Sequence, residues 1–141
     1  MELLPNENII YFGDIARLPY GNKSAHTIEE FTKQTMQFLL TQNIKLIVIA
    51  CNTIAAVAKH IVLNIAGTIP VVDVISAGVS AAINYDNIGI IATKATIKSN
   101  TYTNLIEQID QPLKNKIITA KACPLFVPFI EEGLLTHPAL Q

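Results

Sequence analysis

The feature that most constrains the fold is an alternation of short apolar runs, rich in β-branched residues, with stretches of helical pattern. The apolar runs predict strands at residues 8–12, 46–50, 71–74, 88–92 and 116–119. The intervening stretches predict helices from Ser24 or Thr27 to 41, 52–64, 76–84 and from Thr96 or Ser99 to 110, with a short helical piece within 122–132. This alternation is typical of βαβ units, so we expect an α/β fold with a parallel sheet. The wholly apolar run 46–50 is expected to be a central strand, buried on both faces.

Composition excludes several classes of protein. The 141 residues are 50% hydrophobic and carry 10 Lys and Arg against 11 Asp and Glu. A chain this apolar is not intrinsically disordered, and its balanced charge argues against nucleic-acid binding through phosphate contacts. We expect no secretory signal and no membrane span, since the longest apolar run is far shorter than the roughly 18 residues that a span requires.

The few cysteines and histidines favour a reducing compartment. Cys51 and Cys123 are too sparse for a secreted disulfide framework. His26, His60 and His137 are scattered, and no cluster has the spacing of a zinc site. The sequence therefore predicts a cytoplasmic protein with free thiols and no metal.

Three segments follow predicted strands at the edge where α/β sheets bind ligands: 19–21, 51–53 and 93–96. Cys51 is the sharpest candidate, because it ends an apolar strand just before a helix, and a helix N-terminus favours the reactive thiolate. Asn52 and Thr53 could donate hydrogen bonds to a bound carboxylate or cap the helix. The alternative is a buried, inert cysteine, since free cysteines are among the most buried residues.

The other two segments also have purely structural interpretations. Pro19, Tyr20 and Gly21 are typical of a turn, in which proline fixes φ and glycine accepts a positive φ. Thr93 and Thr96 could act only as helix caps. Cys123 is expected to pack, and Glu131 to be a solvated carboxylate.

Four segments in the same order resemble motifs of bacterial glutamate racemases. They are residues 11–24 (YFGDIARLPYGNKS), 49–53 (IACNT), 91–99 (IATKATIKS) and 123–128 (CPLFVP). The resemblance spans nearly the whole chain and favours a functional Cys51. It implies parts of the two lobes of the aspartate/glutamate racemase fold, each a three-layer, flavodoxin-like or Rossmann-like unit. We expect one partial lobe at 1–76, carrying Cys51, and another at 77–141.

The resemblance implies a cofactor-independent isomerase that interconverts L- and D-glutamate and supplies D-glutamate for peptidoglycan, the polymer that maintains cell shape. In that family one thiolate removes the α-proton and a second thiol returns a proton to the opposite face. Cys51 matches one catalytic cysteine. The positions that match substrate contacts are Pro19, Tyr20, Gly21, Asn52, Thr53, Thr93 and Thr96. Glu131 matches a carboxylate that assists the second cysteine.

The family's Asp-Ser-Gly and Gly-Cys-Thr-His motifs do not occur in these 141 residues. We therefore expect a chain truncated at both ends, with weak or no racemase activity alone and with unpaired sheet edges that favour self-association. The small polar residue and the glycine usual in the family are replaced by Ile15 and Ala92. Two alternatives stay open: an aspartate or hydantoin racemase of the same superfamily, and a non-catalytic remnant that binds acidic ligands.

Overall fold

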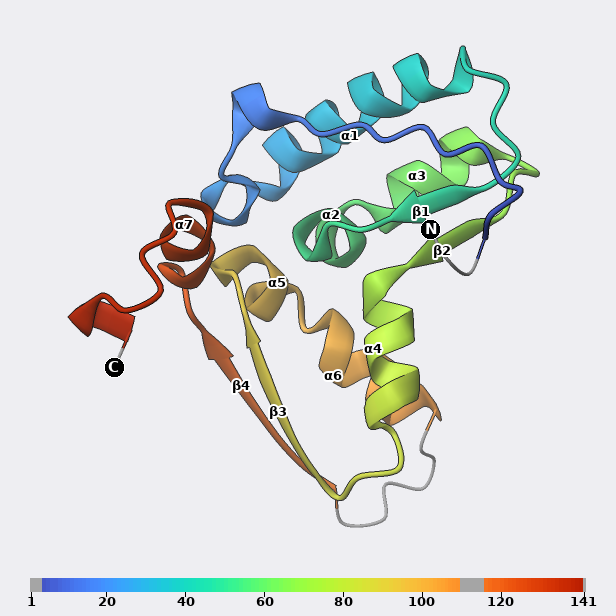
Figure 1. Ribbon diagram of the computed structural model, residues 1–141. Helices are drawn as coiled ribbons and strands as arrows, with labels where there is room; N and C mark the ends of the chain where they lie inside the picture. Colours follow the sequence, from blue (N-terminus) through green and yellow to red (C-terminus); the bar gives the residue numbers. More distant parts are fainter. Residues whose placement is uncertain (1–3, 110–115, 141) are drawn as a thin grey trace.

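The computed structural model describes residues 4–109 and 116–140, which contain two pairs of parallel strands with helices packed around them (Figure 1). Strand β1 (Ile47–Ile49) pairs with β2 (Val71–Asp73), and β3 (Asn87–Ala92) pairs with β4 (Ile117–Ala122). In the register, Ile49 lies opposite Asp73 and Ala92 opposite Ala122. The predicted parallel α/β fold is therefore confirmed.

The helices occupy most of the predicted stretches. They are η1 (Ile15–Arg17), η2 (Tyr20–Asn22), α1 (Ala25–Leu40), α2 (Asn52–Val57), α3 (Lys59–Ala66), α4 (Val74–Ala82), α5 (Lys94–Ser99), α6 (Thr101–Ile109), α7 (Phe126–Glu131) and η3 (Pro138–Leu140). Helix α4 runs through residues 76–78, where the sequence suggested a boundary between lobes. The predicted helix end at Asp110 lies outside the described residues.

Local polar chemistry sets several helix boundaries. The side chains of Ser24, Asp73 and Thr93 accept hydrogen bonds from the first turns of α1, α4 and α5. Asn100 adopts a left-handed conformation with φ 54° and separates α5 from α6. The single predicted helix 52–64 is likewise divided at Ala58 into α2 and α3.

One predicted strand is absent, and the predicted burial of another is wrong. Residues 8–12 form no strand, because no described strand pairs with them. They run along α1 instead, where the Phe12 and Phe38 ring centroids lie 5.5 Å apart (Figure 1). Strand β1 is not buried on both faces, because Val48 is 61% exposed and its register partner Val72 is 49% exposed.

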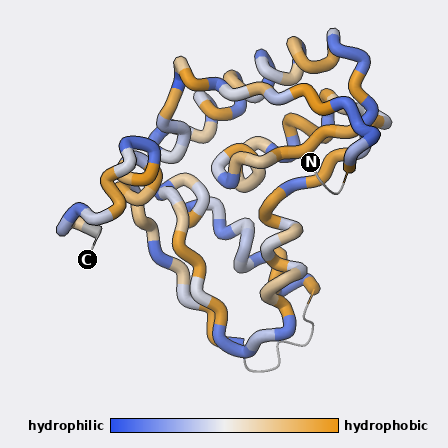
Figure 2. The backbone as a smooth tube through the Cα atoms, viewed as in Figure 1, coloured by the Kyte–Doolittle hydropathy of each residue, from blue (hydrophilic) through white to orange (hydrophobic). Residues whose placement is uncertain are grey.

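One hydrophobic core joins the two strand pairs. It contains Ile47 and Ile49 of β1, Ile75 of α4, Ile90 of β3 and Ile106 of α6. Hydrophobic residues accordingly follow the strands and their adjoining helices (Figure 2). A smaller core contains Tyr20, Ile28 and Ala58 and attaches the segment of η2 to α1 and α2. No helix in the described part of the chain is long and apolar enough to cross a membrane.

Candidate active site

Cys51 lies between the end of β1 and the start of α2, as the sequence predicts. It is the N-cap residue of α2, its backbone carbonyl accepts a 2.9 Å hydrogen bond from the Ala55 amide, and its thiol is free and half-buried. Its side chain makes no capping hydrogen bond to the helix. The thiol therefore stands at the carboxyl end of a parallel strand, the edge at which such sheets bind ligands.

Asn52 and Thr53 form the first turn of α2 and contact the half of the chain that carries β3 and β4. The Asn52 Oδ1 atom accepts a 2.6 Å hydrogen bond from the Tyr102 hydroxyl of α6. The Oγ1 atoms of buried Thr53 and of Thr93 lie 3.1 Å apart, within hydrogen-bonding distance. Neither Asn52 nor Thr53 caps α2, so the capping role suggested for them is wrong.

Thr93 and Thr96 extend this contact into α5. Thr93 caps α5 by accepting a 3.4 Å hydrogen bond from the Thr96 amide, and the two Oγ1 atoms lie 3.1 Å apart. Thr96 is buried. The hydroxyls of Thr53, Thr93 and Thr96 therefore form one chain of hydrogen bonds between α2 and α5.

The segment with Pro19, Tyr20 and Gly21 packs against this threonine chain. Pro19 precedes η2, and both Tyr20 and Gly21 are buried. A Cβ added to Gly21 would lie 2.4 Å from the Thr93 Cβ atom. Gly21 does not have a positive φ, so the turn interpretation is wrong about the reason for glycine. Glycine is required here because η2 and α5 approach so closely.

Asp14 and Arg17 hold Tyr20 from one side. The Tyr20 hydroxyl donates to the Asp14 carboxylate, which also pairs with Arg17 Nε at 2.7 Å, and the Arg17 guanidinium lies 4.4 Å from the centre of the Phe31 ring. Burial and the hydrogen bond to Asp14 raise the pKa of Tyr20, so its phenol stays protonated at neutral pH. Burial opposes ionisation of Asp14, but hydrogen bonds from Tyr20 and Arg17 lower its pKa overall. Sequence reasoning missed both residues, although their three-residue spacing before Tyr20 was a visible signal.

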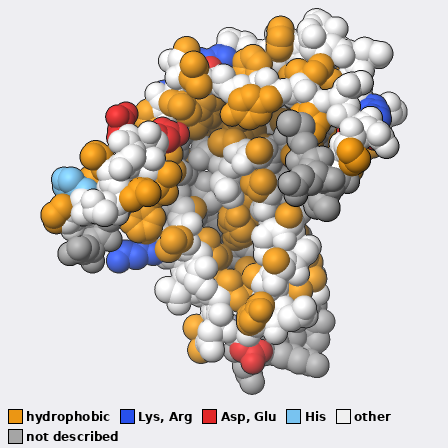
Figure 3. Space-filling model, in the orientation of Figure 1, with side chains coloured by type: hydrophobic (Ala, Val, Ile, Leu, Met, Phe, Trp, Pro, Cys, Tyr) orange, Lys and Arg blue, Asp and Glu red, His pale blue; other side chains and the backbone are white. Residues whose placement is uncertain are grey.

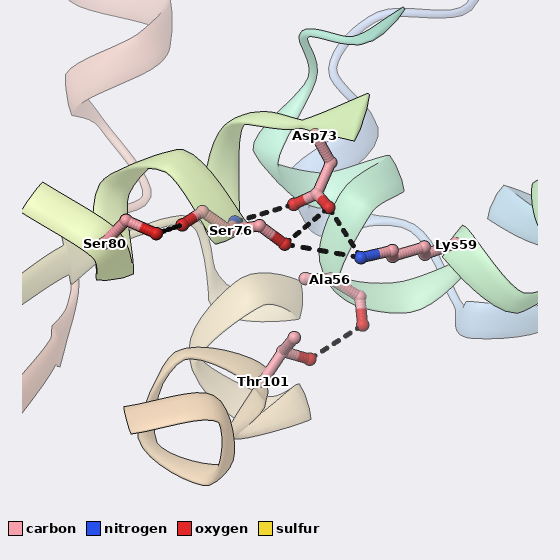
Figure 4. Close-up of polar contacts among 6 residues, drawn as sticks. All are labelled: Ala56, Lys59, Asp73, Ser76, Ser80 and Thr101. Carbon is pink, nitrogen blue, oxygen red and sulfur yellow. Dashed lines mark hydrogen bonds and ion pairs between the residues drawn. The ribbon is translucent and has the colours of Figure 1, made fainter. Parts of the chain in front are cut away.

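A second polar cluster lies where the end of β2 and the start of α4 meet α3 (Figure 4). Asp73, at the end of β2, pairs with Lys59 Nζ at 2.6 Å and accepts hydrogen bonds from the amide and hydroxyl of Ser76 at 2.9 and 2.7 Å. Burial would raise the pKa of Asp73, but the hydrogen bonds from Lys59 and Ser76 lower it. The Thr101 hydroxyl donates to the Ala56 carbonyl at 2.9 Å. The Lys59 contacts fix α3 against the end of β2 and the start of α4, and the Thr101 contact fixes α2 against α6. An aspartate within an otherwise apolar strand was the signal that could have identified this cluster.

Glu131 and Cys123 lie apart from this arrangement. Glu131 ends α7 and is exposed, and its side chain makes no hydrogen bond or ion pair with any residue that the structure describes. Cys123 follows β4 and is half-buried. Large hydrophobic side chains of α7, among them Phe126 and Ile130, are exposed. Figure 3 shows hydrophobic side chains gathered on the surface over α7.

A hollow with a volume of about 460 Å³ lies beside η2 and α5. Lys23, Lys94 and Lys98 line it together with Pro124 and Pro128. Within residues 4–109 and 116–140, no group of three or more His, Cys, Asp or Glu side chains could hold a metal ion.

No family model matches the chain. It is 52% identical over 140 residues to a glutamate racemase of Neisseria gonorrhoeae, and the matched region covers 97% of this chain and 51% of the relative. It is 47% identical over 141 residues to a glutamate racemase of Chlorobaculum tepidum, at 98% and 51% coverage. The chain thus spans about half the length of the curated relatives that it matches.

Solved structures agree with this result. The crystal structure of glutamate racemase from Francisella tularensis in complex with D-glutamate matches with a TM-score of 0.92 and 52% identity, covering 99% of this chain and 52% of that one. The enzyme from Thermus thermophilus in complex with β-chloro-D-alanine matches with a TM-score of 0.81 and 39% identity, at 99% and 50% coverage. The predicted resemblance to glutamate racemase is confirmed in sequence and in fold.

Proposed function

We propose that this chain, which matches one half of glutamate racemases in sequence and fold, contributes one acid/base cysteine and most of its surrounding donors to a glutamate racemase site. The observation that carries the proposal is that Cys51, Asn52 and Thr53, which follow β1, lie beside Thr93, which follows β3, within a chain so similar to racemases. The reaction is the cofactor-independent interconversion of L- and D-glutamate, and its product D-glutamate serves peptidoglycan synthesis.

The chemistry of the reaction explains why such a site suits it. Removing a proton next to a carboxylate places more negative charge on an already anionic group, so the base must be strong and the carboxylate must be held by fixed donors. The Cys51 thiolate accepts the α-proton. Asn52, Thr53, Thr93 and Thr96 bind the substrate, and the segment with Pro19, Tyr20 and Gly21 closes over it. Glu131 assists the second thiol.

Each strand pair belongs to a different lobe in this proposal, the first at 1–76 and the second at 77–141. The threonine chain and the Tyr102–Asn52 hydrogen bond then join the lobes beside Cys51. These 141 residues contain no Gly-Cys-Thr-His motif, and nothing brings Cys123 into contact with the group around Cys51 in the described chain. The chain alone is therefore proposed to abstract the α-proton without efficient inversion.

An exchange experiment tests this proposal. The chain is incubated in D₂O with L-glutamate or with D-glutamate, and deuterium at the α-carbon is measured separately from optical rotation. We expect slow exchange without inversion of at least one enantiomer, loss of exchange in Cys51→Ala, and unchanged exchange in the matched control Cys123→Ala.

Two results would contradict the proposal. Exchange that survives in Cys51→Ala removes that thiol from the mechanism, and inversion at ordinary enzymic rates contradicts the single-thiol view. In a competition experiment, stronger binding of aspartate or hydantoin than of glutamate at the site would reassign the substrate.

We further propose a cytoplasmic protein whose partner is this small amino acid, with no nucleic-acid or membrane partner, and which self-associates. The exposed pair Val48 and Val72 on one face of β1–β2 supports self-association, because contiguous apolar surface marks interaction sites. Sedimentation of the purified chain is expected to give a dimer or larger species. A stable monomer at high concentration would exclude this part of the proposal.

A further inference from the structure

Tyr102 joins three helices beside the candidate site, although no matched motif position assigns it a role. It lies in the first turn of α6, and its hydroxyl donates a 2.6 Å hydrogen bond to Oδ1 of Asn52, fifty positions earlier in the chain. Asn52 is the first residue of α2 and follows Cys51 directly. A single hydrogen bond therefore connects α6 to the residue next to the candidate base.

The surroundings of Tyr102 hold its ring in place. A Cβ built on Gly78 of α4 would lie 3.5 Å from Cε1 of Tyr102 and 3.7 Å from its hydroxyl oxygen, so the ring lies directly over this glycine. The preceding residue, Thr101, donates a hydrogen bond to the Ala56 carbonyl at the other end of α2 (Figure 4). Two successive residues of α6 thus attach to the two ends of the same short helix.

The phenol is suited to act as a donor. Burial, and then the negative charge of Asp73, raise the pKa of Tyr102, so the hydroxyl keeps its proton at neutral pH. A tyrosine hydroxyl has a single proton, and here the hydroxyl donates it in a hydrogen bond to the Asn52 side-chain carbonyl oxygen.

This contact determines which side of the Asn52 amide is free. An asparagine amide is planar, with one acceptor oxygen and a nitrogen that carries two donors on the opposite side. With Oδ1 bound to Tyr102, the Nδ2 group points away from the phenol, and it has no hydrogen-bond partner among the residues that the structure describes. The reverse orientation would turn the carbonyl oxygen toward an incoming carboxylate and repel it.

We propose that Tyr102 is a positioning residue that fixes the Asn52 amide so that its two N–H groups bind a carboxylate of the substrate beside Cys51. This inference rests on the proposed function for its ligand, but the Tyr102–Asn52 contact can be measured without any ligand.

The experiment compares Tyr102→Phe, which keeps the ring, with the control Tyr85→Phe, whose side chain is 65% exposed. The side-chain amide of Asn52 is observed by nitrogen-15 NMR in the full chain and identified by its loss in Asn52→Ser. We expect the Asn52 signals to shift and their hydrogen exchange to accelerate in Tyr102→Phe, with no change in Tyr85→Phe.

Titration with L-glutamate then tests the role of the freed donors. In the unmodified chain the Asn52 N–H signals are expected to move on binding, and Tyr102→Phe is expected to bind about fivefold more weakly, the factor that about 1 kcal/mol represents. A second variant, Asn52→Asp, keeps the acceptor for Tyr102 but replaces the donors by a negative charge. It is expected to weaken binding by more than fivefold.

Each other outcome overturns a defined part of the inference. Unchanged Asn52 signals in Tyr102→Phe refute the Tyr102–Asn52 hydrogen bond itself. If the Asn52 signals shift in Tyr102→Phe but the affinity for glutamate is unaltered, the positioning role is refuted. If the Asn52 signals shift in Tyr102→Phe but no variant binds glutamate, the Tyr102–Asn52 contact is established. That result overturns both the proposed binding of a carboxylate by Asn52 and the proposed function.

Discussion

Replacing Gly21 by alanine tests whether the close approach of η2 to α5 is as tight as the structure indicates. The new Cβ would lie 2.4 Å from Cβ and 2.5 Å from Cγ2 of Thr93. Rotation of the Thr93 side chain moves Cγ2 but not Cβ, so the backbones must separate by about 1 Å to restore ordinary carbon–carbon contact.

The expected magnitude follows from the cost of overpacking, which is typically about 1–3 kcal/mol in a well-packed region. Gly89 provides a matched control, because a Cβ there meets nothing within 4 Å and its φ is not positive. Gly89→Ala is expected to leave the free energy of unfolding unchanged or to raise it by about 0.4–1 kcal/mol through the unfolded state. Urea unfolding followed by circular dichroism measures both variants.

A double variant identifies the source of the loss. Thr93→Gly removes the three atoms that lie nearest to the new Cβ of Gly21→Ala, and glycine is only a few tenths of a kcal/mol worse than threonine as a helix N-cap. Gly21→Ala should therefore destabilise the double variant less than it destabilises the unmodified chain. Equal stability of Gly21→Ala and Gly89→Ala, or no recovery in the double variant, would refute the reasoning.

Three further predictions concern stability. Asp14 and Asp73 have lowered pKa values in the folded chain, so their stabilisation is present at neutral pH and is lost as the pH falls below about 3.9 toward their folded-state pKa values; urea unfolding from pH 7 to 3 should show this loss, and a gain on acidification would contradict it. Ile75→Ala, at a side chain only 1% exposed, should cost about 2–5 kcal/mol, whereas Val48→Ala should change stability by no more than about 0.5 kcal/mol, and similar losses would argue against the described core. Ser24→Ala removes the cap of α1 and should cost about 1 kcal/mol in the same assay, with no loss expected if Thr27 rather than Ser24 were the cap.

Features that depend on neighbouring residues in the sequence could be predicted from it. The parallel α/β class follows from the alternation of apolar runs and helical stretches, and the structure confirms it. Cys51 does lie between a strand and a helix, and Ser24 and Thr93 are caps, because capping involves residues only three positions apart.

Features that depend on partners distant in the sequence could not be predicted from it. Residues 8–12 have the composition of a strand, but a strand forms only beside a partner, and none of the described strands pairs with them. Val48 is exposed for a related reason, because burial of both faces requires layers that cover them. The break at Ala58 carries no proline or glycine that would have indicated it.

The candidate residues were found from local motifs, but the contacts that assemble them are tertiary. Nothing in the sequence pairs Gly21 with Thr93 or Tyr102 with Asn52, because each pair is separated by some tens of positions and by several helices. The sequence did place Asp14, Arg17 and Tyr20 at intervals of three, and this periodicity was a usable signal, as was Asp73 within an otherwise apolar strand.

A count of protons indicates which of these contacts matters most for a bound carboxylate. The hydroxyls of Thr53, Thr93 and Thr96 have one proton each, and the two hydrogen bonds between them use two of the three. The threonine chain can therefore offer one proton to a ligand without losing an existing hydrogen bond. Asn52 offers two more, provided that Tyr102 keeps its carbonyl oxygen occupied. The orientation of a single amide thus controls two of the three side-chain protons that Asn52 and the three threonines can direct to a carboxylate without rearrangement. Tyr102→Phe should therefore weaken glutamate binding although Tyr102 itself need not touch the substrate.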